Sequence, residues 1–222
     1  MRIGFLGVVA GSLALAACGM VPDGRTVAPA RSGPVSTAPV IQSLQGRQCL
    51  ADLGKAGARF APLPDKLEAG GCSTSNTVSL HELAGDVGRF SVTNLPNVGC
   101  QVAGEFADWA RFGVDRAARQ ILGSGLARID TYGSYSCRNV AGTNRLSAHS
   151  RAGAIDVAAF VLADGRRITV KEGWNASPAE REFLRTVHAS ACRRFGTVLG
   201  PEYNAAHKDH LHLEYGSGSF CR

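Results

Sequence analysis

The stretch AIDVAAFVLADGRRITV, residues 154–170, decides the fold. Apolar side chains alternate with Asp156 and a small residue along its first half, which is the period of a strand buried on one face. An Asp-Gly pair at 164–165 then separates two β-prone runs, as in the tight turns of hairpins. We therefore expect a β-hairpin with strands at 156–162 and 167–170.

Other periodic segments surround this hairpin. An alternating run at 127–131 predicts a further strand, and apolar residues at helical spacing predict a helix over 101–119. Ser177 and Pro178 are typical of an N-cap and a first helical residue, and the helix that follows should end at Gly196. Because helices and strands are mixed without a βαβ rhythm, we expect an α+β fold with a small antiparallel sheet and flanking helices.

The composition is that of a globular protein that can bury a core. Of the 222 residues, 45% are hydrophobic and 19% are charged. The 24 Lys and Arg against 18 Asp and Glu give a net charge of +6, which weakly favours anionic partners. No basic run is interleaved with aromatic residues, so nucleic acid is not an expected partner. We expect a monomer.

The N-terminus is typical of a secretory signal. MRIGFLGVVAGSLALAAC has one basic residue, Arg2, before an apolar run that is too short to span a bilayer. Its end, Leu-Ala-Ala-Cys18, resembles the signal of bacterial lipoproteins, in which this cysteine is lipidated, although ordinary secretion with an incidental cysteine is the alternative. The resemblance implies a protein anchored to the cell envelope and facing the periplasm, and Gly19 after the cysteine favours the outer membrane.

The chain after this signal divides into a linker and a domain. Residues 19–45 hold four of the nine prolines and no aromatic residue, so they cannot bury much apolar surface. We therefore expect a signal peptide at 1–17, the lipidated Cys18 and a flexible linker at 18–45, and one folded domain at 46–222.

Six cysteines remain once Cys18 is set aside, an even number in an exported chain, which predicts disulfides and argues against a free catalytic thiol. Fifteen pairings are possible, and we favour the sequential one. Its pairs are Cys49 with Cys72, Cys100 with Cys137, and Cys192 with Cys221.

The stretch NAAHKDHLHLEYG, residues 204–216, holds three of the six histidines. As a strand, HLHLEY places His210, His212 and Glu214 on one face and the leucines in the core. The alternative is that this segment is a solvent-exposed strand without a functional role, since a His-x-His pair alone is common on such strands.

A second segment, which contains His149 and Asp156, favours a functional site over an exposed strand. His149 lies seven positions before Asp156, a carboxylate that needs a partner because it stands in an apolar strand. With His212 these residues would supply the three protein ligands of a catalytic zinc, which keeps its fourth position for water. A general base is needed near that water. The candidates are Asp209, His210 and His207.

These motifs carry a resemblance to known families. Ser-Ala-His149, Gly-Ala-Ile-Asp156 and the distant His-x-His212 resemble the zinc signature of the D-alanyl-D-alanine carboxypeptidase and hedgehog-type fold, which includes murein endopeptidases. Through GSYSCRN, RLSAHSRAGAIDV and FGTVLGPEYNAAHKDHLHLE the chain is also similar to the bacterial extensin-like C-terminal domain family. The signature usually has glycine three residues after its histidine, where this chain has Ala152.

The resemblance implies roles for individual residues. It makes His149, Asp156 and His212 the zinc ligands, and it matches Arg138 to an arginine that steadies the oxyanion. Asp209 matches the base of several members, whereas His207 and His210 match a histidine pair used in others. Strand alternation favours His210 over Asp209, so both stay open.

The expected function is a zinc metallopeptidase that acts on the stem peptides or crosslinks of peptidoglycan. The alternative is a non-catalytic domain that binds zinc or the cell wall. A third interpretation, an iron oxygenase with two histidines and one carboxylate, is disfavoured by the spacing of His149 and Asp156 and by the envelope location.

Overall fold

The structure is a computed structural model that describes residues 43–222. The expected signal peptide, Cys18 and nearly all of the expected linker lie outside the described residues. Within 43–222, no helix is of a length and apolarity that would let it cross a membrane.

The described elements alternate irregularly between helices and strands. The helical segments are α1 (Leu44–Lys55), η1 (Ala69–Gly71), α2 (Cys100–Asp108), the π-helix η2 (Trp109–Asp115), α3 (Arg116–Leu122), η3 (Ala148–Arg151), α4 (Val170–Gly173), α5 (Pro178–Ala191) and η4 (Ala205–His207). The strands are β1 (Arg59–Pro62), β2 (Lys66–Leu67), β3 (Ser73–Thr74), β4 (Thr77–Ala84), β5 (Arg89–Val92), β6 (Val98–Gly99), β7 (Leu126–Gly133), β8 (Ala154–Leu162), β9 (Arg167–Thr169), β10 (Thr197–Leu199), β11 (Leu211–Glu214) and β12 (Phe220–Cys221).

One large sheet dominates the described residues. Ten strands join in the order β1-β4-β5-β7-β8-β11-β10-β12, with β6 beside β4 and β9 beside β8. The α+β class is confirmed, but the expected small, antiparallel sheet is wrong in size, and the pairs β5–β7 and β10–β12 are parallel. Strands such as β6 and β12 have two residues each, too few for an alternating pattern to be visible in the sequence.

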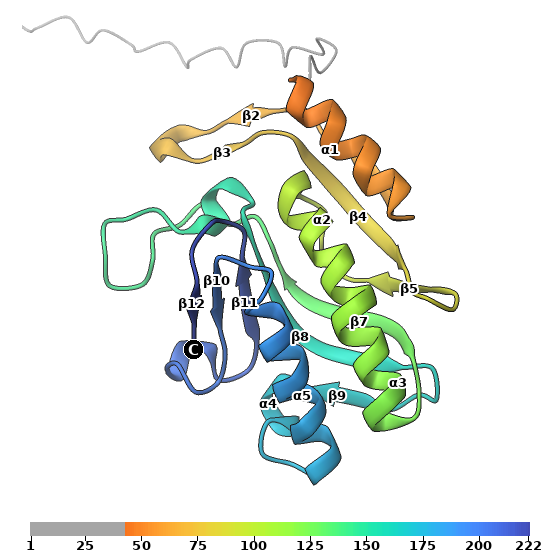
Figure 1. The fold of residues 1–222 in the computed structure, drawn as a ribbon. Coiled ribbons are helices and arrows are strands. Elements are labelled where there is room, and N and C mark those ends of the chain that lie inside the picture. The colour runs from red at the N-terminus through yellow and green to blue at the C-terminus, as the bar shows by residue number, and fades with distance from the viewer. Residues whose placement is uncertain (1–42) are drawn as a thin grey trace, which may run out of the picture. The chain divides into compact units, whose positions relative to one another are not determined.

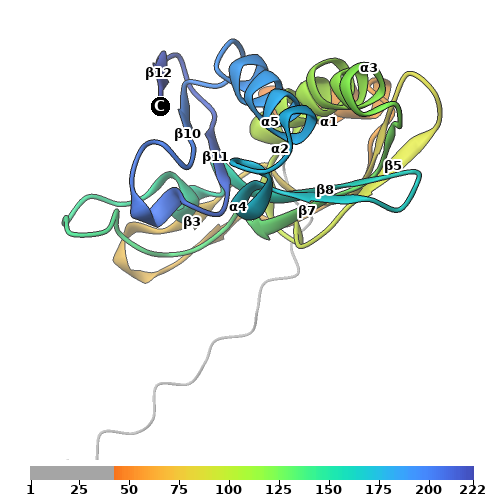
Figure 2. The ribbon, with the colours of Figure 1, turned by 90° about the horizontal axis from the view of Figure 1, so that it is seen from below.

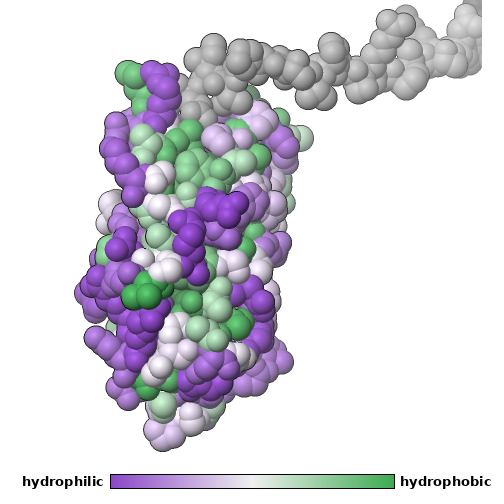
Figure 3. All heavy atoms as spheres, turned by 90° about the vertical axis from the view of Figure 1, so that its right-hand side faces the viewer, coloured by the Kyte–Doolittle hydropathy of each residue, from purple (hydrophilic) through white to green (hydrophobic). Residues whose placement is uncertain are grey.

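The helices α1, α2, α3 and α5 lie together on one face of this sheet (Figure 1, Figure 2). Phe106, Trp109, Phe160 and Phe183 are fully buried in the core. The indole N–H of Trp109 donates to the carbonyl of Val187 at 3.0 Å and so links η2 to α5. On the side seen in Figure 3, hydrophilic residues are interspersed with smaller hydrophobic areas, as is usual for a protein surface.

The hairpin expected from residues 154–170 is confirmed. β8 pairs with β9 in antiparallel register, with Phe160 opposite Ile168. Gly165 takes a φ of 90° in the turn, a conformation that favours glycine. The strand expected at 127–131 is β7, and it pairs with the other edge of β8.

Both expected helices are present with changed details. The helix expected at 101–119 is the run α2, η2 and α3, and its middle is a π-helix. There Gly113 approaches α5 so closely that a Cβ would stand 2.4 Å from the Oγ of Ser190. The Ser177 side chain caps α5 as expected, but the helix ends at Ala191 rather than at Gly196, next to Cys192, which pairs with Cys221.

The disulfides correct the expected pairing. The pair Cys192–Cys221 is present, but the other two are Cys49–Cys100 and Cys72–Cys137. α1 packs against α2, which brings Cys49 to the first residue of α2 with a Cα–Cα distance of 6.2 Å. The sequential pairing was wrong because it assumed that neighbours in sequence are neighbours in space.

Candidate metal centre

Three side chains from separate elements converge at one point. His149 lies on η3, Asp156 on β8 and His212 on β11. The Nδ1 of His212 is 2.9 Å from Asp156 Oδ1 and 3.2 Å from the Nε2 of His149. The Nε2 of His149 is also 3.2 Å from Asp156 Oδ2. The structure therefore brings together the three residues that the sequence suggested as ligands.

The backbone explains why they meet. β8 and β11 are antiparallel neighbours, and their register sets His212 directly opposite Asp156. The Oγ of Ser147 accepts from the backbone N–H of His149 and begins the short helix that carries this histidine. Ala152 ends that helix in the left-handed region, with a φ of 53°. Ala152, which stands where the zinc signature usually has glycine, thus adopts the left-handed conformation that glycine favours.

The donor set fits a zinc ion. Ligand atoms at about 2.0–2.2 Å from a tetrahedral zinc lie about 3.3–3.6 Å from one another. The three distances here, 2.9, 3.2 and 3.2 Å, approach that spacing before any ion draws the groups into place. Two imidazoles and one carboxylate are also a ligand set typical of catalytic zinc sites. His149 and His212 are 3% and 8% exposed, so few waters compete with an ion.

Each histidine has a partner on the ring nitrogen that faces away from the group. The Nδ1–H of His149 donates to the carbonyl of Ser134 at 2.5 Å, which leaves the lone pair of Nε2 directed at the group. The Nε2 of His212 is 3.6 Å from the carboxylate of Glu214. Such outer contacts orient metal-ligating imidazoles and increase their basicity.

The charges of the group are strongly coupled. Burial alone would raise the pKa of Asp156, but hydrogen bonds with His149 and His212 outweigh it and hold that pKa far below its usual range. Burial alone would lower the pKa of His212, but its bonds with Asp156 and Glu214 raise it to about 9. At neutral pH the metal-free group therefore holds a proton on His212, which a metal ion would displace.

His210 and Asp209 form a pair beside this group. The Nδ1–H of His210 donates to Asp209 Oδ1 at 3.0 Å, and its Nε2 lies 3.7 Å from Asp156 Oδ1. His210 precedes β11, yet its ring faces the same point as His212. The hydrogen bond from His210 lowers the pKa of Asp209, which stays a carboxylate at neutral pH. Of the two residues left open by the sequence, His210 is thus nearer to the ligands and Asp209 orients it.

His207 and Arg138 lie farther out. The ring of His207 is 5.1 Å from that of His210 and 5.9 Å from that of His212, and its Nδ1–H donates to Asn204. Burial, and then the charges of His210 and His212, lower the pKa of His207 to about 4. Arg138 is exposed and close enough to His207 to contribute to this shift.

Sequence reasoning gave no role to three residues at the site. The alternation of HLHLE places Glu214 on the same face as His210 and His212, so its contact with His212 could have been predicted from the sequence. Tyr132 on β7 sets its ring 5.7 Å from His210, and burial followed by the charge of Asp209 raises its pKa. The carbonyl of Ser134 belongs to the backbone, so no side-chain pattern announces it.

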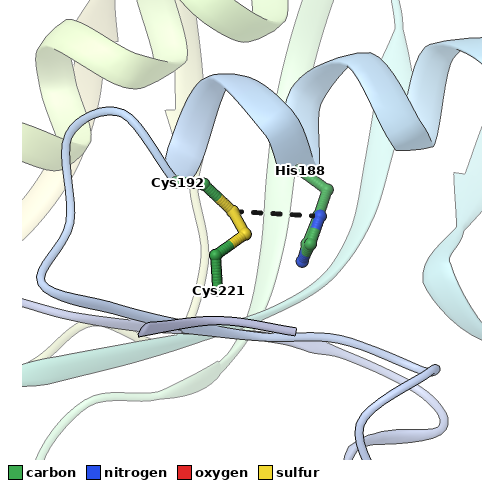
Figure 4. A group of neighbouring side chains, drawn as sticks. All are labelled: His188, Cys192 and Cys221. Carbon is green, nitrogen blue, oxygen red and sulfur yellow. Dashed lines mark hydrogen bonds between the residues drawn. A yellow bond between two sulfur atoms is a disulfide. The ribbon is translucent and has the colours of Figure 1, made fainter. Parts of the chain in front are cut away.

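A second group with metal-ligand atoms has a different character. His188, Cys192 and Cys221 lie together, but the two sulfurs form a disulfide and offer no thiolate (Figure 4). The Nε2–H of His188 donates to the carbonyl of Arg222 at 3.2 Å, and burial lowers the pKa of this histidine. This group therefore joins α5 to the end of the chain.

The family described as Extensin-like protein C-terminus matches residues 47–222. No curated protein and no solved structure is significantly similar to the chain. The match takes in every residue of the candidate metal centre, from Arg138 to Glu214, and most of the chain. The chain therefore belongs to the extensin-like C-terminal family.

Proposed function

We propose that residues 46–222 are a zinc-dependent peptidase that hydrolyses peptide bonds in the stem peptides or crosslinks of peptidoglycan, with a fold of the D-alanyl-D-alanine carboxypeptidase and hedgehog type. The observation that carries the proposal is the convergence of His149, Asp156 and His212 within 3.2 Å of one another, beside a histidine that a carboxylate orients. A purely structural zinc site has four protein ligands and needs no such pair.

Zinc bound by these three residues would polarise the scissile carbonyl and lower the pKa of a bound water. His210 is the general base, because its Nε2 faces the ligands while Asp209 accepts from its Nδ1–H. It takes a proton from the attacking water, and the carboxylate of Asp209 stabilises the imidazolium that forms. The same nitrogen then returns the proton to the leaving amine.

Three further residues assist the ligands and the base. The exposed guanidinium of Arg138, near His207, supplies positive charge for the oxygen that becomes negative as the carbonyl is attacked. His207 keeps a neutral ring at physiological pH, because its pKa is about 4, and so adds no repulsion to a cationic site. Glu214 holds His212 in the orientation that presents Nδ1.

The test uses the purified full chain, zinc and isolated peptidoglycan sacculi. We expect new muropeptide fragments by mass spectrometry, lost in Asp156→Asn and in His210→Gln and kept in His81→Gln, a histidine on β4. His210→Gln should still bind one equivalent of zinc, which separates the base from the ligands. Stoichiometric zinc without any fragment would refute the peptidase and support the alternative, a non-catalytic domain that binds zinc or the cell wall.

We further propose that the chain is lipid-anchored at Cys18 and faces the periplasm, in the outer membrane. An anchor followed by a proline-rich linker lets an enzyme reach a fixed polymer, and the three disulfides suit an oxidising compartment. The Cys18→Ala chain should move from the membrane fraction to the soluble fraction of cell lysates. Retention in the membrane fraction would contradict the anchor without bearing on the peptidase.

A further inference from the structure

Tyr132 stands on β7 at a point where the pairing of that strand with β8 is irregular. Thr131 lies opposite Val157 of β8. Gly133 lies opposite the adjacent residue of β8, Asp156, so Tyr132 is an extra residue between two paired ones. Gly133 takes a φ of 117°, a conformation that residues other than glycine rarely adopt. Such bulges turn a side chain in a new direction and recur next to active sites.

The side chain of Tyr132 contacts both members of the Asp209–His210 pair. Its ring lies 5.7 Å from the ring of His210 at an interplanar angle of 70°, edge to face. Its hydroxyl lies within hydrogen-bonding reach of the Asp209 carboxylate. Partial burial raises the pKa of Tyr132, and the negative charge of Asp209 and the hydrogen bond to it raise that pKa further. The residue is 56% exposed, so these contacts rather than core packing account for its orientation.

The pair needs such an anchor because both of its members lie outside regular structure, between η4 and β11. The hydrogen bond from His210 to Asp209 joins neighbours in the chain, so it orients the imidazole without fixing the pair to the sheet. The backbone N–H of His210 reaches the carbonyl of His207 only at 3.5 Å. Tyr132, by contrast, belongs to a strand that pairs directly with β8, the strand that carries Asp156.

The strand β7 is itself held at this point. The hydroxyl of Thr131 donates to the carbonyl of Thr93 at 2.7 Å, and the backbone N–H of Thr93 donates to the carbonyl of Ile129 at 3.1 Å. Thr93 follows β5, which runs parallel to β7. A contact from a strand fixes a neighbouring side chain more precisely than a contact from a loop. Tyr132 therefore links a loop-borne pair to the rigid part of the sheet.

We propose that Tyr132 is a positioning residue for the general base, one that holds the Asp209–His210 pair so that the Nε2 of His210 stays directed at the reacting atoms. The proposal rests on the function given above and adds a residue to it. The carboxylate of Asp209 accepts from both His210 and Tyr132, since a carboxylate has room for several donors. A base that keeps one orientation is more often within reach of the proton that it takes, so loss of the hydroxyl lowers kcat and leaves substrate affinity unchanged.

The first experiment measures the contact without any turnover. In the full chain labelled with ¹³C at the tyrosine Cζ, the four tyrosines give separate signals that report ionisation as the pH is raised, and Tyr132→Phe assigns that of Tyr132. Asp209→Ala removes a negative charge and an acceptor beside the phenol, so the pKa of Tyr132 should fall. The matched control is Glu68→Ala, which removes the carboxylate that accepts from the Tyr135 hydroxyl at 2.6 Å and should lower the pKa of Tyr135 alone. A Tyr132 pKa that Asp209→Ala leaves unmoved would overturn the proposal, whether or not the chain is a peptidase.

The second experiment measures kcat and KM for a stem-type peptide with the zinc-loaded full chain. Tyr132→Phe should lower kcat about fivefold, since it loses one exposed hydrogen bond to a charged group, with KM and zinc content unchanged. In the Asp209→Ala background the same replacement should have no further effect, because the hydroxyl then has no carboxylate to hold. Tyr135→Phe, the matched loss of a hydroxyl that donates to a carboxylate, should change neither constant.

The two kinetic constants and the two backgrounds separate positioning from other roles of Tyr132. A raised KM with an unchanged kcat would overturn the proposal, because Tyr132 would then contact the substrate. An equal loss of kcat with and without Asp209 would also overturn it, because Tyr132 would act independently of the pair. If the native chain cleaved nothing while Asp209→Ala still lowered the pKa of Tyr132, the peptidase would be refuted and only the contact would stand.

Discussion

Glu214→Gln tests how the candidate metal centre is held, because it changes an outer contact and leaves all three ligands in place. Outer-shell partners of metal-bound histidines are usually worth 10-fold to 100-fold in affinity. The Glu214 carboxylate is 3.6 Å from the Nε2 of His212, and its side chain is 40% exposed. Both values weaken the contact, so the low end applies, about tenfold in zinc affinity or about 1.4 kcal/mol.

The assay is competition for zinc between the protein and a chromophoric chelator at neutral pH. Asp156→Asn removes a ligand and should lose far more affinity than Glu214→Gln, whereas Glu182→Gln, an exposed glutamate on α5, should match the native chain. Thermal unfolding of each metal-free variant shows whether the fold is kept. If Glu214→Gln bound zinc within twofold of the native affinity, Glu214 would have no orienting role.

Three further predictions follow from the same contacts. Because the pKa of His212 is raised to about 9, zinc binding at pH 7 should release about one proton, and the affinity should rise with pH until about 9; calorimetry in buffers of different ionisation enthalpy measures this, and a buffer-independent heat would contradict it. Asp209→Asn should lower kcat at least tenfold with zinc content unchanged, since His210 loses the partner that orients it; unchanged kcat would make Asp209 a bystander. Replacing Cys72 and Cys137 by alanine removes a disulfide that joins residues 65 positions apart. The chain-entropy relation predicts a loss of about 4 kcal/mol in the free energy of unfolding, which denaturant titration measures. A loss under 1 kcal/mol would show that the unfolded chain is already restricted between these two positions.

The parts of the fold that could be predicted are those specified by local patterns. The hairpin at β8 and β9 depends on alternation and on one Asp-Gly turn, and the start of α5 depends on Ser177 and Pro178. The sheet's full extent and two of the disulfides depend on contacts between distant segments. No short window contains the information that Cys49 faces Cys100.

The candidate site was predictable to the same degree. His149, Asp156 and His212 were identified from residue type, spacing and resemblance, and the chain brings them together because β8 and β11 are antiparallel neighbours in one register. The sequence could not assign separate roles to Asp209 and His210, because the roles depend on which ring nitrogen of His210 makes each contact.

The point at which β11 begins explains why the sequence pattern did not predict the separate roles of Asp209 and His210. Alternation places His210 and His212 on one face only while the chain is extended, and β11 begins at Leu211. Just before it the chain turns through η4, which frees His210 to point its Nε2 at Asp156 and its Nδ1–H at the preceding residue, Asp209. A carboxylate adjacent to a histidine in sequence rarely shares its face in a strand, but it can reach the ring across a turn. The turn before β11 therefore makes the alternating strand pattern fail at His210, and it also lets Asp209 orient the adjacent His210 as a base.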